Sequence, residues 1–231
     1  MEPMTETSRH TDRPHGRRRP PRREGPYDRE PLPPEQQTED PERLSRFLAL
    51  VLRHRAYQFD LRVDDEGFVR LDELMRVMHE QRNLGWVEHK HIDALLSGQE
   101  RTRFEVRDGN IRATYGHSFN RPVRYEPIDP PEHLFLGVPR GKVADLRTSG
   151  VKPSGRQYVH LSANKDDALQ IAKQQDPEAT LVTVLAQEAA RSGIPFHLPA
   201  EGIYLAARVP PEFLEVEVHY GRALKKSKRR P

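Results

Sequence analysis

An amphipathic helix predicted over residues 41–55 is the feature that most constrains the fold. Its large apolar residues recur at the i, i+3, i+4, i+7, i+8 spacing of one helix face: Leu44, Phe47, Leu48, Val51 and Leu52. Asp40 and Pro41 are typical of an N-cap followed by a proline at the first helical position. We therefore expect the first part of the fold to be organised around this helix.

Two cations, Arg53 and His54, end the predicted helix. At about 100° per residue, Arg53 points away from the apolar stripe and His54 lies on its edge. The negative end of the helix dipole favours cations in the last turn, so one interpretation is an ordinary helix end. The other is a rigid Arg-His pair that holds an anion. This segment alone favours the first.

Two polar tails flank the predicted core. The 231 residues are 35% hydrophobic and 32% charged, a low apolar share for a fully globular chain, so a long polar segment must dilute the core. We predict that residues 1–40 form a disordered, basic and proline-rich tail, because they contain almost no large apolar side chains. Residues 221–231 form a second basic tail. Such tails bind nucleic acid or are merely solvated, and both interpretations stay open.

The cellular setting is predicted from what the sequence lacks. There is no cysteine, which excludes disulfides and thiolate metal sites and suits a reducing cytosol. No apolar run reaches the length of a membrane span, and the N-terminus lacks the apolar region of a signal peptide. We expect a cytoplasmic monomer with no membrane partner and no metal.

Residues 41–120 are predicted to form a winged-helix lobe, a shape that commonly binds nucleic acid. Further helices are expected at 71–78 and 86–96, followed by a hairpin with strands at 103–107 and 111–115. Three helices and a two-stranded ribbon are typical of this nucleic-acid-binding shape. Alternation along the second strand displays Arg112 on the face opposite to Ile111, and a loop with His117 and Ser118 follows.

Beyond a proline-rich linker at 121–132, residues 133–220 change pattern. Strands alternate with short helices, so an α+β fold with a mixed second lobe fits better than a doubly wound parallel sheet. The strands are expected at 133–137, 158–161, 181–185, 195–198, 203–206 and 214–218, and the helices at 140–148, 165–174 and 187–191. Neither a P-loop nor a G-x-G-x-x-G turn is present.

Five stretches carry a family resemblance: LSRFLALVLRH, DDEGFVRLDELM, IRATYGHS, GVKPSGRQYVHLS and IPFHLPAEGIYLAARVPPEFLE. Together they cover about residues 42–216 and resemble the RNA 2′-phosphotransferases, NAD-dependent enzymes that act after tRNA splicing. The resemblance implies a winged-helix lobe packed on an ADP-ribosyltransferase-like lobe, with the active site between them. It also implies NAD as co-substrate and, as partner, RNA that bears an internal 2′-phosphate.

The reaction that the resemblance implies has two steps. The 2′-phosphate attacks C1 of the nicotinamide ribose of NAD, nicotinamide leaves, and an ADP-ribosylated RNA 2′-phosphate forms. The ribose 2″-hydroxyl then attacks the phosphate, which releases RNA and ADP-ribose 1″,2″-cyclic phosphate. Because the nucleophile is already an anion, the first step needs cations more than a carboxylate base, and the arginine fork binds phosphate bidentately.

By match to the family motifs, three groups of site residues are expected. The catalytic residues are Arg53, His54 and Arg112, the RNA phosphate is bound by His117 and Ser118, and NAD is bound by Gly137, Arg156, His160, Leu161 and Ser162.

The chain departs from the family pattern on the NAD side. The family's Tyr-His-Gly-Thr strand end is Phe135-Leu136-Gly137-Val138 here, and apolar side chains cannot hydrogen-bond a ribose or an amide. The family's Gly-x-Arg-His-Gly segment is 172–176, where Lys173 is the only cation. Two other functions therefore stay open: an ADP-ribosyltransferase acting on phosphorylated nucleic-acid ends, and an RNA-binding module that has lost NAD turnover.

Overall fold

The computed structural model of the protein describes residues 31–98 and 102–216. Residues 1–30 of the first predicted tail and all of the second, 221–231, lie outside the described residues, as does the end of the strand expected at 214–218. Residues 31–40, which were included in the first predicted tail, are held on the first lobe. They contain the short helix η1 (Pro34–Gln36), and the backbone N–H of Leu32 donates to the carbonyl of Arg82 at 2.8 Å.

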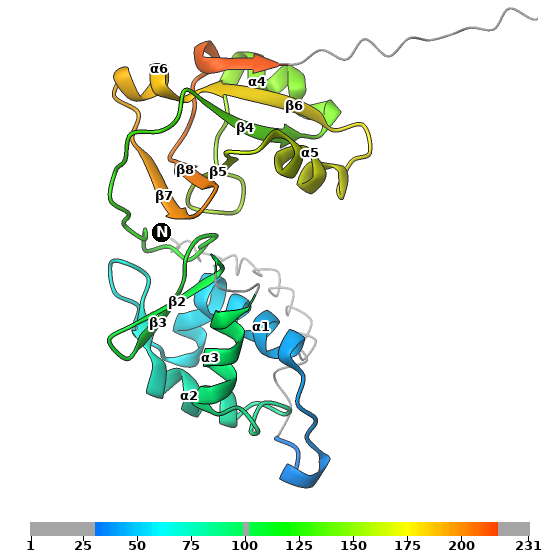
Figure 1. Ribbon diagram of the computed structural model, residues 1–231, viewed down its shortest axis with the longest axis vertical. Helices are drawn as coiled ribbons and strands as arrows, with labels where there is room; N and C mark the ends of the chain where they lie inside the picture. The colour runs from blue at the N-terminus through cyan, green and yellow to red at the C-terminus, as the bar shows by residue number, and fades with distance from the viewer. Residues whose placement is uncertain (1–30, 99–101, 217–231) are drawn as a thin grey trace, which may run out of the picture.

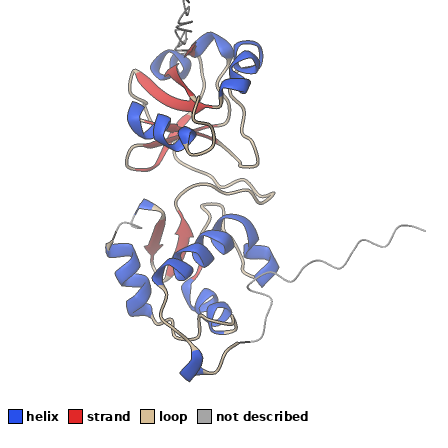
Figure 2. Cartoon of the chain, turned by 90° about the vertical axis from the view of Figure 1, so that its right-hand side faces the viewer, coloured by secondary structure: helices blue, strands red, loops and turns tan. Residues whose placement is uncertain are grey.

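The fold is mixed α/β, with two antiparallel sheets in two bodies (Figures 1 and 2). The first sheet has the order β1-β3-β2 and the second the order β7-β8-β5-β4-β6-β9. Every strand pair in them is antiparallel, which confirms the expected α+β mixture over a parallel doubly wound sheet. Within residues 31–98 and 102–216, no helix is long and apolar enough to span a membrane.

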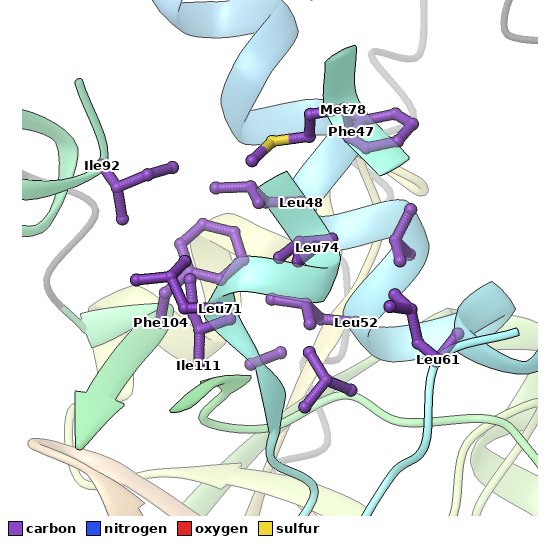
Figure 3. Close-up of a cluster of buried hydrophobic side chains, with 14 of the residues drawn as sticks. Phe47, Leu48, Leu52, Leu61, Leu71, Leu74, Met78, Ile92, Phe104 and Ile111 are labelled. Carbon is purple, nitrogen blue, oxygen red and sulfur yellow. The ribbon is translucent and has the colours of Figure 1, made fainter. Parts of the chain in front are cut away.

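The first body packs its helices on the three-stranded sheet. Its elements are α1 (Pro41–Leu50), η2 (Val51–Arg55), η3 (Ala56–Phe59), β1 (Val69–Arg70), α2 (Leu71–His79), α3 (His89–Ser97), β2 (Phe104–Arg107) and β3 (Asn110–Ala113). Figure 3 shows Phe47, Leu48 and Leu52 of the first helix packed with side chains of α2 and β3. The predicted apolar stripe is thus the centre of this core.

Two predicted element ends differ in the structure. The last turn of the first helix, η2, is π-helical, with hydrogen bonds that close at i→i+5, and Val51 and Leu52 in it keep their expected places in the core. The third helix begins at His89, later than expected. The backbone N–H of Glu88, just before it, donates to Nδ1 of His91 at 2.9 Å, which fixes the start. The hairpin forms as expected, with a turn at Asp108 and Gly109, which both have positive φ.

The second body follows the expected order of strands and helices. Its elements are β4 (His133–Val138), η5 (Arg140–Lys142), α4 (Val143–Ser149), β5 (Val159–Ser162), α5 (Lys165–Lys173), β6 (Thr180–Leu185), α6 (Ala186–Arg191), β7 (Phe196–Ala200), β8 (Ile203–Ala206), η6 (Pro211–Phe213) and β9 (Leu214–Val216). Leu134 and Val138 of β4 face the second core. The alternate residues face α5, whose Ala168 and Ala172 lie against Gly137.

Two consecutive residues, Gln157 and Tyr158 of the second body, hydrogen-bond the backbone of residues 119–123, where the chain leaves the first body. The side chain of Gln157 accepts the N–H of Val123 and donates to the carbonyls of Phe119 and Arg121, at 2.7 to 2.9 Å. The Tyr158 hydroxyl donates to the carbonyl of Val123 at 2.9 Å. Val123 belongs to the first core and is 1% exposed. These bonds fix the two bodies relative to each other at the candidate site.

Candidate functional site

The π-helical turn is joined to the loop that follows the hairpin. The Ser118 N–H donates to the carbonyl of Arg53 at 2.9 Å, and Nδ1 of His54 lies 2.7 Å from the Ser118 hydroxyl. The first bond satisfies a carbonyl that the helix end leaves without an intrahelical partner. The structure therefore brings Arg53, His54 and Ser118 together.

The Arg53 side chain, in the π-helical turn, is partly buried. Its guanidinium carbon lies 5.0 Å from the centre of the Tyr115 ring. Its Nε and Nη2 are buried and have no hydrogen-bond partner. Burial lowers the pKa of Arg53, as do the charges of Arg103 and Arg156, while Tyr115 opposes the shift.

Gly116 makes room for this arginine. It has φ +92°, a conformation that L side chains rarely adopt, and a Cβ there would lie 3.3 Å from Cδ of Arg53. A larger residue would strain the loop and press on the guanidinium. Glycine in the IRATYGHS stretch is thus explained by backbone conformation and by close approach.

His117 is deeply buried, at 2% exposure. Its Nδ1 lies 3.1 Å from the hydroxyl of Tyr125, and its Nε2 is buried without a partner. Burial lowers the pKa of His117 to about 3, and the charges of Arg53 and Arg112 contribute to the shift. The ring is therefore neutral at pH 7.

The second body contributes Arg156 and His160. The His160 ring lies 5.8 Å from the ring of Tyr115, and its Nε2 is also buried without a partner. Burial and then the charge of Arg156 lower the pKa of His160 to about 4. Arg156 also lowers the pKa of His54, after burial and Arg53. Arg53 and His160 therefore face Tyr115 from different bodies.

The charges around these rings have one sign. In the part of the chain that the structure describes, every charged side chain that shifts the pKa of His117 or His160 is an arginine or a histidine. The same part contains no group of histidines and acids that could hold a metal ion. The buried guanidinium N–H groups of Arg53, beside these cations, suit an anion with several oxygens, such as a phosphate dianion.

Arg112 is not displayed on the hairpin face as expected. Only 13% of its side-chain surface is exposed, because Glu105 lies directly opposite on β2. Nε and Nη2 of Arg112 lie 2.7 and 2.6 Å from Oε2 of Glu105, and Nη1 donates to the carbonyl of Glu66 at 2.9 Å. The guanidinium also stacks at 4.5 Å on the Phe68 ring. The fork of Arg112 is thus occupied within the protein.

The remaining expected NAD-side residues have structural surroundings of their own. A Cβ on Gly137 would lie 2.2 Å from the Ala168 carbonyl, so this glycine lets α5 approach β4. The Leu161 side chain is 2% exposed and belongs to the second core. The Ser162 hydroxyl accepts the N–H of Asn164 at 3.0 Å, just before α5 begins. Their expected contacts with NAD stay predictions.

Two residues of the site were missed by the sequence reasoning. Tyr115 was assigned to the apolar face of the hairpin, but β3 ends at Ala113 and the tyrosine packs against His160 and beneath Arg53. Gln157 had no pattern to single it out, since its partners are backbone groups of a distant segment. The position of Tyr115 between two site motifs was the signal that could have identified it.

The buried imidazole of His117 gives a pH prediction. Its folded pKa of about 3 lies below the unfolded value near 6.5. As the pH falls from 6.5 towards 3, the unfolded chain binds a proton that the folded chain does not, so stability is lost. The wild-type unfolding free energy should fall more steeply than that of His117→Gln between pH 6 and pH 4, by up to about 1.4 kcal/mol per pH unit. Urea unfolding at several pH values measures this, and equal slopes would contradict it.

Comparisons with known proteins agree with one another. Residues 39–208 match the family model described as "RNA 2'-phosphotransferase, Tpt1 / KptA family". A protein of Acetivibrio thermocellus is 35% identical over 178 residues, which is 77% of this chain and 98% of that protein. Proteins of Thermococcus kodakarensis and Bacillus thuringiensis are 31% and 30% identical over 76% and 75% of this chain, and 97% and 94% of their own. All three carry the name probable RNA 2′-phosphotransferase.

Proposed function

Because the chain belongs to the RNA 2′-phosphotransferase family, we propose that it transfers the 2′-phosphate of an RNA to NAD. The products are RNA with a free 2′-hydroxyl, nicotinamide and ADP-ribose 1″,2″-cyclic phosphate. The observation that carries the proposal is the pair of buried guanidinium nitrogens of Arg53, Nε and Nη2, that have no hydrogen-bond partner. A buried donor without a partner costs free energy in the folded protein, so a site built this way gains stability when a ligand supplies the acceptor.

The first body would hold the phosphate. Arg53 donates from Nε and Nη2 in the fork geometry that suits a phosphate, and its stacking on Tyr115 fixes the guanidinium plane. His54, oriented by the Ser118 hydroxyl, donates a hydrogen bond or moves a proton at the phosphate oxygen. His117 and Ser118 lie in the same loop, and the family motif assigns both to the phosphate.

Arg112 has a conditional role in this proposal. Its charge acts on His117, so it adds to the positive potential at the phosphate. Its nitrogens bind Glu105, and they become available to a phosphate oxygen only when that ion pair opens. We assign Arg112 to phosphate binding on the evidence of the motif, with Glu105 as its partner before substrate binds.

The second body would bind NAD, which supplies an electrophilic ribose carbon with nicotinamide as leaving group. Two observations fit this co-substrate. His160 has an unpartnered buried nitrogen, and exposed Arg156 lies close enough to lower the pKa of Arg53 and His54. Strands β4 and β5 pair at Phe135 and Ser162. Leu161 and Ser162, the other expected NAD contacts on this side, follow His160 on strand β5.

The architecture proposed with this function has two lobes. Residues 41–120 form a winged-helix lobe that binds RNA, and residues 133–220 form an ADP-ribosyltransferase-like lobe that binds NAD. The helices and hairpin of the first body, and the six-stranded antiparallel sheet of the second, support this division. The segment 121–132 contributes Val123 to the first core and Ile128 to the packing of the second.

The test is phosphate release from a 2′-phosphorylated oligoribonucleotide, with and without NAD. Release only with NAD, together with ADP-ribose cyclic phosphate, is the expected result. RNA that accumulates with ADP-ribose still attached would instead favour an ADP-ribosyltransferase with a weak second step. Tight RNA binding without nicotinamide release would favour an RNA-binding module, and either result would overturn the proposal.

A further inference from the structure

A hollow of about 420 Å³ lies on the first body beside the candidate site. Its lining comes from the chain after the π turn, from β1 and the residue before it, from the start of β3 and from the segment that leaves the first body: Tyr57, Arg62, Val63, Phe68, Asn110 and Arg121, with Asp64 and Arg70. None of these residues is among those expected to bind the 2′-phosphate or NAD. The hollow is therefore separate from the proposed reaction site.

Two aromatic contacts connect the hollow to the phosphate loop. The Tyr57 ring packs edge-on against Phe119 at 5.6 Å, and Phe119 packs against His117 at 5.3 Å. On the other side, Phe68 lines the hollow and carries the guanidinium of Arg112 at 4.5 Å. A single aromatic ring therefore separates the hollow from each of two residues of the proposed phosphate site, Phe119 from His117 and Phe68 from Arg112.

Tyr57 presents an aromatic surface to solvent. It is 47% exposed, one of the few large apolar or aromatic side chains that the described part of the chain leaves open. Its contact with Phe119 holds the ring in place. Unstacked nucleic-acid bases bind such rings, and single-stranded RNA is recognised largely through them.

The arginines of the hollow differ in their partners. Arg121 pairs with Asp65 and also donates to the carbonyl of Val63 at 3.3 Å, while Arg70 pairs with Asp72. Exposed Arg62 makes no ion pair with any residue in the described ranges. The carboxylate of Asp64 is engaged by the N–H groups of its own turn, including that of Phe68 at 2.8 Å. Arg62 is therefore the cation available to a backbone phosphate.

We propose that this hollow binds the nucleotide next to the one that carries the 2′-phosphate, with its base on Tyr57 and its backbone phosphate at Arg62. The inference rests on the proposed function, because it takes the RNA strand to be held at Arg53 and His117. It adds a second contact point, so affinity for RNA depends on strand length beyond the phosphorylated nucleotide. Base stacking tolerates different bases, so the subsite should bind a neighbouring nucleotide whatever its base.

The test measures RNA binding by fluorescence anisotropy in the absence of NAD. The probes are a single nucleotide that carries a 2′-phosphate, and the same nucleotide extended by three nucleotides on the 5′ or the 3′ side. Extension should tighten binding by the wild-type protein, and Tyr57→Ala should reduce that gain about tenfold for one of the two extended probes. Tyr57→Phe keeps the ring and should keep the gain.

A second measurement tests Arg62 through salt. Arg62→Ala should reduce the slope of log affinity against log salt for the same extended probe by about 0.7, the contribution of one single-strand phosphate contact. Arg147→Ala, an exposed arginine on α4 outside the hollow, is the matched control and should keep the wild-type slope.

Three results would overturn the subsite: no gain on extension of the probe by the wild-type protein, an equal loss for all probes in Tyr57→Ala, or the same loss in Tyr57→Phe. The assay contains no NAD, so a failure of phosphate release leaves this comparison intact. Conversely, phosphate release with an unchanged extension gain in Tyr57→Ala would reject the subsite alone.

Discussion

Replacing Arg53 with alanine is expected to slow NAD-dependent phosphate release about 10³-fold, the loss typical of removing an arginine that stabilises a transferring phosphoryl group. Two of its nitrogens are buried without a partner, and the ring of Tyr115 fixes its plane. Lysine provides the charge without the planar fork, so Arg53→Lys should remain at least about tenfold slower than wild type. Single-turnover release from a saturating 2′-phosphorylated RNA measures both variants.

The Arg53 variants should fold normally. The guanidinium is buried with unsatisfied donors, so its removal relieves a desolvation penalty and should not lower the unfolding midpoint. Arg55→Ala changes an exposed arginine in the same π turn and is the matched control. Turnover in Arg53→Ala within a few-fold of that in Arg55→Ala would show that the phosphate is held elsewhere.

Replacing Gly137 with alanine is expected to destabilise the protein by about 3 kcal/mol, at the upper end for overpacking. A Cβ there would lie 2.2 Å from the Ala168 carbonyl and 2.5 Å from the Cβ of Ala172, so α5 would have to move away from β4. At the near neighbour Gly141, a Cβ would meet no atom within 4 Å, so Gly141→Ala should change stability by less than about 0.5 kcal/mol. Urea unfolding measures both variants.

The Gly137 variant also separates two roles for this residue. The family resemblance implies contact with NAD, whereas the structure gives it a packing role between β4 and α5. Loss of stability together with weaker NAD binding fits the packing role, since α5 is displaced. A variant with wild-type stability and impaired NAD binding alone would contradict the packing role and favour direct contact.

Local periodicity predicted most elements, and its failures have physical causes. The apolar stripe of the first helix repeats regularly and was confirmed through Leu52, which is 1% exposed. The π turn, which includes Leu52, could not be predicted from the stripe. The bond from the Ser118 N–H to the carbonyl of Arg53 joins segments far apart in the chain, and no local pattern encodes it.

Arg112 shows a signal that was present but not used. The hairpin turn at Asp108 and Gly109 fixes the register, and that register places Glu105 opposite Arg112. Opposite charges at such cross-strand positions attract, so the ion pair follows from the turn alone. By contrast, the approach of His160 to Tyr115 joins two separately packed cores, and no local pattern encodes it.

The hydrogen bonds from Gln157 and Tyr158 to the backbone of Val123 affect how the protein unfolds. Gln157 binds the N–H of this residue and Tyr158 binds its carbonyl, while its side chain is buried in the first core. Loosening either body therefore removes bonds that order the other, which raises the cooperativity of unfolding. A calorimetric scan should then show one heat-absorption peak where two uncoupled bodies would give two.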